Sequence, residues 1–194
     1  MAARVRGYPR VMHTSTIERG DGSTNALDCV QECVEHEQDE HSHGEERPLG
    51  GYLVLLGTYL TTVIGLGLVV RRRRKLPARP AVADLALVAV ATHKVARMLS
   101  KDSVLAAVRM PFTRFEGPAG VGEVHESVRG SGLRHAVGEL LTCPFCLAQW
   151  VATGFTFGLL LAPRATRQVA SVFCAVTASD YLQLAYCAAE KKAE

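Results

Sequence analysis

Two cysteines separated by two residues, Cys143 and Cys146, stand directly before an apolar run at residues 147–162. Thiolates are nucleophiles and soft metal ligands, so such a pair can exchange with a disulfide or supply two ligands to zinc. If Cys143 is the N-cap of a helix that begins at Pro144, free backbone N–H groups point at its sulfur and favour the thiolate. The sequence therefore predicts a thiol or metal site at Cys143 and Cys146.

Three interpretations of this pair stay open. The four residues 143–146 look like a glutaredoxin active site, but an amphipathic pattern precedes them where glutaredoxins have a strand. A closed zinc site needs four ligands, and since the chain has no second Cys-x-x-Cys, a histidine (His135, His125 or His93) or a second subunit would have to complete it. We favour the third interpretation, in which the pair shapes the start of a helix and packs against its neighbours.

A weaker candidate metal set lies near the N-terminus. Cys29, Cys33 and His36 follow one another at four and three residues, so one helix face would carry all three. The segment from residue 28 to 46 also holds eight acidic residues and no basic one, a composition that predicts disorder. We therefore expect residues 1–48 to be an acidic, histidine-containing flexible arm, and favour this over a metal site.

The thiol pair must be positioned by apolar helices, of which the first covers residues 49–70. This segment has no charged residue and is long enough to cross a hydrocarbon core at about 1.5 Å per residue. A basic run follows it and consists of Arg71, Arg72, Arg73, Arg74 and Lys75. Because positive residues stay in the cytoplasm, this run is a topology signal within a basic linker over residues 71–80.

Residues 81–189 are expected to form a membrane domain, with a tail at 190–194. Helices are predicted at about 81–99, 133–141, 144–162 and 168–189, and a tight turn at 164–167. The polar segment between the first two of these helices carries the turn residues of a short hairpin. The expected fold is all-α: a small polytopic membrane bundle of three to four hydrophobic helices, with a cytoplasmic loop that holds the hairpin.

Two polar residues fall inside the last predicted helix. Asp180 lies near its middle and Gln183 one turn later. A carboxylate in lipid is costly, so Asp180 should face protein and find a cationic partner, for which Arg97, Lys94 and His93 are the candidates. We favour such an interhelix contact over a proton or ion pathway.

The helix at 81–99 decides the orientation. Its apolar stretch is about a dozen residues long and contains Asp84, which we expect to cap its first turn. If this helix does not cross, residues 71–142 all lie in the cytoplasm, as the positive-inside rule favours. We therefore expect a multi-pass protein of the cell (plasma) membrane, with Cys143 and Cys146 on the cytoplasmic side, where thiols stay reduced.

Several motifs in the second half of the chain carry a family resemblance. They are Lys94-Val-Ala-Arg97, Lys101-Asp102, Arg109-Met-Pro-Phe112, Gly138-Glu-Leu-Leu141, and Cys143-Pro-Phe-Cys146 followed by Trp150. On these motifs residues 92–189 resemble an uncharacterised bacterial membrane family, domain of unknown function 1360. The resemblance implies a small multi-span membrane protein and supplies no catalytic residue.

The predicted function is that of an integral membrane protein with a non-enzymatic envelope or assembly role. Its expected partners are the lipid bilayer and a second copy of the chain or another membrane protein; a net charge of +3 is too small to predict nucleic acid binding. The alternative is a membrane-bound Cys-x-x-Cys protein that binds a metal, with zinc as the cofactor, or cycles between dithiol and disulfide. Transport through the bundle with Asp180 is the third candidate.

Overall fold

The structure, a computed structural model, describes residues 48–72 and 81–193. Within these ranges the chain is helical except for one hairpin of two strands, which confirms the predicted all-α class and the hairpin. The predictions for residues 1–47, including Cys29, Cys33 and His36, and for Arg73, Arg74 and Lys75 lie outside the described residues.

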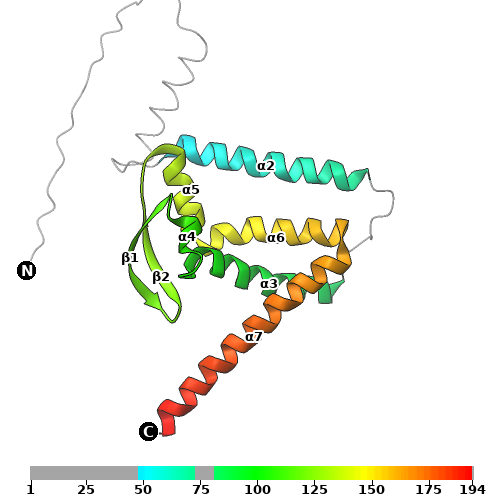
Figure 1. The fold of residues 1–194 in the computed structure, drawn as a ribbon. Coiled ribbons are helices and arrows are strands. Elements are labelled where there is room, and N and C mark those ends of the chain that lie inside the picture. The colour runs from blue at the N-terminus through cyan, green and yellow to red at the C-terminus, as the bar shows by residue number, and fades with distance from the viewer. Residues whose placement is uncertain (1–47, 73–80, 194) are drawn as a thin grey trace, which may run out of the picture. The chain divides into compact units, whose positions relative to one another are not determined.

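The described elements follow one another along the chain as shown in Figure 1. They are α2 (Leu49–Arg71), α3 (Val82–Lys101), α4 (Ala106–Arg109), β1 (Thr113–Gly120), β2 (Glu123–Val128), α5 (Gly132–Thr142), α6 (Pro144–Leu161) and α7 (Pro163–Ala193). The two strands pair antiparallel, with register shifts between Phe115 and Gly117 and between Pro118 and Gly120.

Three of these helices, α2, α6 and α7, are long and apolar enough to cross a membrane. Only 6% of the apolar window of each helix is buried inside the protein. On α2 the exposed large residues are Leu53, Val54, Leu56, Leu60, Ile64, Leu68 and Val69. A helix that shows apolar side chains all round needs an apolar surrounding, which a bilayer supplies without leaving backbone groups unsatisfied.

Helix α3 packs between α6 and α7 and buries small side chains such as Ala91 and Ala96. It runs parallel to α7, because Asp84 near its start pairs with Arg167 near the start of α7, and Lys94 farther along pairs with Asp180. With 20 residues, α3 is about 30 Å long. This length lets α3 extend from the end of the helices where α7 begins to the end where α6 begins.

Helix α2 runs in the same direction as α6. Near the start of α2, the Tyr52 hydroxyl donates to Glu139 of α5. Two turns later, the Tyr59 hydroxyl lies 3.0 Å from the Thr153 hydroxyl of α6. The rings of Tyr59 and Trp150 also meet edge to face, with centroids 5.1 Å apart. The first turns of α2 and α6 consequently lie at the same end of the helices.

The direction of α2 relative to α6 bears on the expected topology. Because α2 and α6 run in the same direction, Arg71 at the end of α2 and Cys143 before the start of α6 lie at opposite ends of the helices. The sequence-based expectation placed both in the cytoplasm by assuming that residues 71–142 stay on one side. If α2 crosses the membrane, those two expectations cannot both hold, since α3 carries the chain from one end to the other.

The junction of α6 and α7 also differs from the prediction. Residues 164–167, expected as a tight turn, belong to the first turns of α7, which begins at Pro163. The chain turns at Ala162 instead (φ −142°, ψ 66°), and Pro163 then starts a helix where its missing N–H costs nothing. A Cβ on Gly158 would lie 2.8 Å from the Thr166 hydroxyl, so this glycine lets the two helices approach closely.

Residues 102–142, here called the polar module, lie at the Cys143 end of the helices (Figure 1). At its centre the side chain of Arg109 is 1% exposed and pairs with Glu126 of β2. The same guanidinium donates to the backbone oxygens of Leu99 and Asp102, each at 2.8 Å. Arg109 therefore fastens the end of α3 to the hairpin.

Candidate functional site

The thiol pair occupies the joint between α5 and α6. Cys143 is the N-cap of α6 and Pro144 its first residue, as the sequence predicts, and the Cys143 sulfur accepts a hydrogen bond from the Cys146 N–H at 3.2 Å. Cys143 is half-buried, whereas Cys146 and the intervening Phe145 are exposed. Both sulfurs thus lie in one helical turn at the edge of the polar module.

The local sequence explains this joint. A residue before proline is pushed out of the helical region, and Cys143 accordingly adopts φ −99° and ψ 105°. Its N–H still donates to the Glu139 oxygen at 3.1 Å, which closes α5, while its own oxygen accepts from Leu147 at 3.1 Å and opens α6. One residue therefore ends one helix and begins the next.

The histidine proposed to complete a metal site is engaged elsewhere. His135 Nδ1 lies 3.1 Å from the Gly130 oxygen and its Nε2 lies 3.5 Å from a Glu139 oxygen. Within residues 48–72 and 81–193, no three side chains of the types His, Cys, Asp and Glu gather as metal ligands would. The described chain therefore brings none of the suggested histidines to Cys143 and Cys146.

The predicted contact of Asp180 is present. Lys94 Nζ of α3 donates to Asp180 Oδ2 of α7 at 2.5 Å, so one of the three candidate cations is the partner. Gln183 lies one turn farther along α7 and is exposed. The interhelix contact that the sequence favours for Asp180 is thus the one found.

Asp84 has a different role from the one expected. It sits in the first turn of α3 but makes no capping bond; both its oxygens accept from Arg167, one from Nε and one from Nη2, each at 2.7 Å. A fork of this kind fixes orientation as well as distance. The sequence did not predict this second ion pair between α3 and α7, because Arg167 was expected in a turn and not in a helix.

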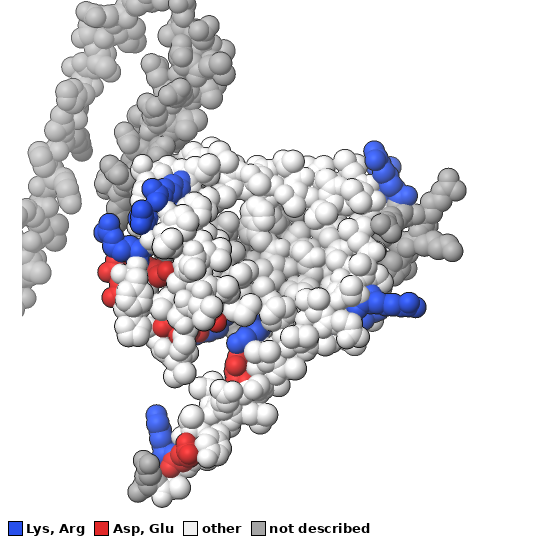
Figure 2. Space-filling model, viewed as in Figure 1, with Lys and Arg blue, Asp and Glu red and all other residues white. Residues whose placement is uncertain are grey.

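The opposite end of the helices, here called the basic end, carries Arg71, Arg72 and Arg164. None of the three has an acidic partner among the residues that the structure describes. Figure 2 shows blue atoms without red neighbours at this end, mixed red and blue atoms over the polar module, and a mostly white surface between them. The two ends of the helices therefore differ in charge.

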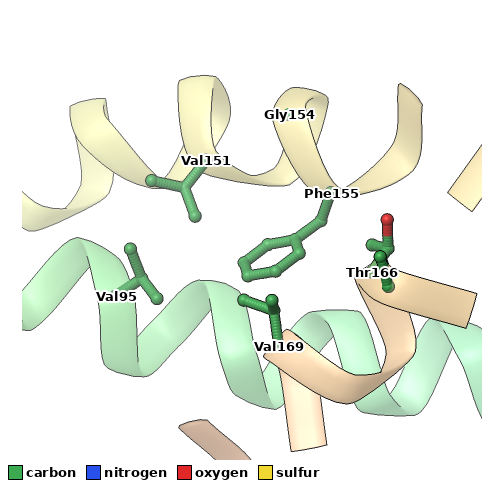
Figure 3. Close-up of a pocket in the computed structure, with 7 residues that line it drawn as sticks. Val95, Val151, Gly154, Phe155, Thr166 and Val169 are labelled. Atoms are coloured by element: carbon green, nitrogen blue, oxygen red, sulfur yellow. The ribbon is translucent and has the colours of Figure 1, made fainter. Parts of the chain in front are cut away.

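An open groove of about 390 Å³ lies between α3, α6 and α7. Its lining residues are Val95, Val151, Gly154, Phe155, Ala165, Thr166 and Val169. Figure 3 shows Val95, Val151 and Val169 around the ring of Phe155, which projects from α6. Sequence reasoning missed this groove because these are ordinary helix residues, and only the packing of three helices brings them together.

Comparison with known protein families identifies the family of this chain. Residues 87–186 match the family described as "Protein of unknown function (DUF1360)", a stretch that covers just over half of the chain. It includes the thiol pair, the polar module, and both members of the Lys94–Asp180 pair, and it leaves out α2. No curated protein and no solved structure matches the chain. With its three apolar helices and this match, the chain belongs to the DUF1360 family, whose molecular activity is unknown.

Proposed function

We propose that this protein is an integral protein of the cell membrane with a non-enzymatic assembly role, in which α2 associates with α2 of a second copy. The observation that carries the proposal is an open face on α2. No atom lies within 4 Å of the place where a Cβ on Gly57 or Gly65 would stand. Thr61, between them on the same face, donates its hydroxyl to the Gly57 oxygen at 2.8 Å.

This face suits close helix packing. Small residues at four-residue spacing let two helix backbones approach, and a threonine whose hydroxyl is satisfied within its own helix adds no polar cost in lipid. The described part of the chain places no other helix against Gly57 and Gly65. A partner from outside this copy is therefore the simplest occupant of the face.

Co-purification of two differently tagged copies from membranes tests the assembly role. Replacement of Gly57 and Gly65 by isoleucine should reduce the co-purified fraction by about tenfold, because the larger side chains separate the helices. Gly67→Ile is the matched control, since Gly67 also faces open space but lies off the Gly57 face. Equal co-purification of the double variant and the control would contradict the proposal.

We further propose that the basic end faces the cytoplasm and the thiol pair the outer side. The charge balance supports this orientation: among the described residues, the basic end carries Arg71, Arg72, Arg164 and Arg167 against the single carboxylate of Asp84, whereas residues 97–142 carry six basic and five acidic side chains. Positive charge that is not neutralised is what the positive-inside rule retains in the cytoplasm. This reverses the orientation expected from sequence for the two cysteines.

Single-cysteine variants in intact cells test the orientation. In a chain that keeps only Cys146, a membrane-impermeant maleimide should label the exposed thiol without lysis. In a chain without native cysteines, Arg72→Cys should become labelled only after lysis. The reverse labelling pattern would place the thiol pair in the cytoplasm and overturn the proposed orientation.

A second candidate function is that of a membrane-bound dithiol. It is favoured by the geometry of the joint, in which the Cys143 sulfur and the Cys146 N–H are 3.2 Å apart. In exchange with a partner protein's disulfide, a bond would form between Cys143 and Cys146 while the partner's two sulfurs take up the two electrons and leave as thiols. On the outer side such an oxidised pair persists.

Thiol trapping and elemental analysis of the same purified sample separate this candidate from a metal site. Redox cycling predicts a mixture of free and bridged Cys143–Cys146 in cells, and a zinc site predicts near-stoichiometric zinc. A fully reduced, metal-free pair whose double serine variant complements a deletion strain would leave packing as its role.

A further inference from the structure

The carboxylate of Glu139 is held beside the thiol pair by two neighbouring side chains. Glu139 lies one turn before Cys143 on α5, and its backbone oxygen accepts the Cys143 N–H at 3.1 Å. One oxygen of its carboxylate accepts from the Tyr52 hydroxyl of α2, and the other lies 3.5 Å from His135 Nε2. Side chains of α2 and α5 therefore fix this carboxylate at the joint between α5 and α6.

The carboxylate also reaches the thiols electrostatically. Glu139 lies near enough to Cys146 for its negative charge to act on that thiol, and the side chains of Cys143 and Cys146 share a hydrogen bond. The side chain of Glu139 is 43% exposed, so a proton that it accepts can pass on to solvent. A base, a thiol pair and an exit for the proton are thus close together, as proton transfer requires.

The two cysteines differ in what disulfide exchange asks of them. The Cys143 sulfur accepts the Cys146 N–H at 3.2 Å at the start of α6, where free N–H groups and the helix dipole stabilise a thiolate. A thiolate at Cys146 would stand beside the negative charge of Glu139, unless the thiol proton moves onto that carboxylate. Cys143 is therefore the attacking sulfur, and Cys146 is the one that must lose its proton during the reaction.

We infer that Glu139 accepts the proton of Cys146 when the thiol pair exchanges with the disulfide of a partner protein. The inference rests on the proposed dithiol function. The Cys143 thiolate first attacks the partner's disulfide, which forms a mixed disulfide and releases one partner thiolate. The Cys146 sulfur then attacks the Cys143 sulfur while its proton moves to Glu139. The bond between Cys143 and Cys146 forms, the mixed disulfide breaks, and the second partner thiolate leaves with the electron pair.

The rates of the two steps test the inference in the full-length chain that keeps only Cys143 and Cys146. The reduced protein is mixed with dithiobis(nitrobenzoate), a disulfide whose two thiolates absorb visible light as each is released. Glu139→Gln should slow release of the second thiolate by about tenfold at pH 7, where an ordinary thiol is only a few per cent ionised, and leave the first nearly unchanged. The difference should vanish above about pH 10, where hydroxide removes the thiol proton.

Three further variants control for structure and charge. Glu190→Gln removes a carboxylate near the C-terminal end of α7 and should leave both steps as in the wild type. Glu139→Asp keeps a carboxylate and should restore part of the second step. Tyr52→Phe removes a donor to Glu139, so it should slow the second step by less than Glu139→Gln, and it gives the same test if the glutamine variant does not fold.

A second step that is equally fast or faster in Glu139→Gln would overturn the inference, because the carboxylate would then act on the thiols through its charge alone. Mass spectrometry of the product separates the two proposals. A bridge between Cys143 and Cys146 that forms at the same rate in both proteins contradicts only the role of Glu139. If the wild type ends with both cysteines labelled and no bridge, the dithiol function fails and the inference fails with it.

Discussion

The polar module and the helices both contain carboxylate–cation pairs, but they surround these pairs differently. In the module, the side chains of Arg109 and Glu126 are 1% and 5% exposed. Between α3 and α7, the side chains of Lys94 and Asp180 are 22% and 46% exposed. In a water-soluble protein, a pair as exposed as Lys94 and Asp180 would be a solvent-screened surface ion pair.

An exposed side chain faces water in the polar module, but faces the expected lipid on the helices. Arg109 is enclosed by protein, and its donors reach Glu126 and two backbone oxygens, so its cost of burial is met inside the module. The exposed part of Lys94 and Asp180 lies on helices expected in lipid, where neither water nor salt screens charge. The pair is then important to stability despite its exposure, unlike an exposed pair in water.

The largest expected effect breaks the module. Arg109→Met removes the partner of a buried carboxylate and two backbone contacts, and we expect it to lower the free energy of unfolding by about 3–5 kcal/mol. Thermal unfolding in detergent measures the loss. Arg114→Met, on the exposed side of β1, is the control and should change little. A loss below about 1 kcal/mol in Arg109→Met would show that the module is not organised around this side chain.

The next effect separates α2 from the module. A Cβ on Gly51 would lie 2.8 Å from that of Ala136 and 2.9 Å from the Gly132 oxygen, so Gly51→Ala should cost about 1–3 kcal/mol by overpacking. Gly50→Ala is the matched control, because no atom lies within 4 Å of its Cβ position. Protease resistance of the α2–α5 contact in detergent measures both. Equal resistance of the two variants would mean that α2 is not packed on α5.

The contribution of the ion pair between α3 and α7 to stability depends on the surrounding medium. Lys94→Met should destabilise the protein by about 1 kcal/mol in detergent and by more in lipid nanodiscs, since the carboxylate of Asp180 is then unpaired. Exchange of the two charges (Lys94→Asp with Asp180→Lys) should recover part of the loss. If Lys94→Met unfolds identically in both media, the pair faces water.

The last prediction concerns Thr92, whose buried hydroxyl has no hydrogen-bond partner within residues 48–72 and 81–193. Thr92→Val keeps the shape and removes the unsatisfied group, so we expect a gain of about 1 kcal/mol or less. Thr62→Val, whose hydroxyl donates to the Thr58 oxygen at 2.8 Å, serves as the control. A clear loss of stability in Thr92→Val would indicate that the hydroxyl is bonded in the membrane.

Sequence patterns predicted the elements that depend on local chemistry. The uncharged run that became α2 and the Cys143–Pro144 helix start follow from hydropathy and capping, which a single segment carries. Asp180 finds Lys94 because few cations are available near the apolar helices. The hairpin followed from its glycine-rich turn, where Gly122 has a φ of 75°.

What the sequence missed depends on how helices meet. The start of α7 was placed too late because arginines at 164 and 167 suggest a turn, whereas Asp84 on α3 neutralises one of them inside a helix. The direction of α2 relative to α6 needs contacts such as Tyr59 with Trp150, which no local pattern reports. Arg109 was noted only as part of a motif, since burial of an arginine is visible only once its partners are assembled.

The length of α7 has a consequence for the membrane around the protein. With 31 residues it is about 46 Å long, while α6 with 18 residues is about 27 Å. The stretch of α7 between Arg167 and Glu190 has 22 residues and is about 33 Å long, slightly more than a hydrocarbon core of about 30 Å, and Figure 1 shows α7 inclined to α6. Hydrophobic mismatch would then set its tilt, so that a thicker bilayer draws α7 upright and moves Lys191 and Lys192 with it. The C-terminal end would report bilayer thickness.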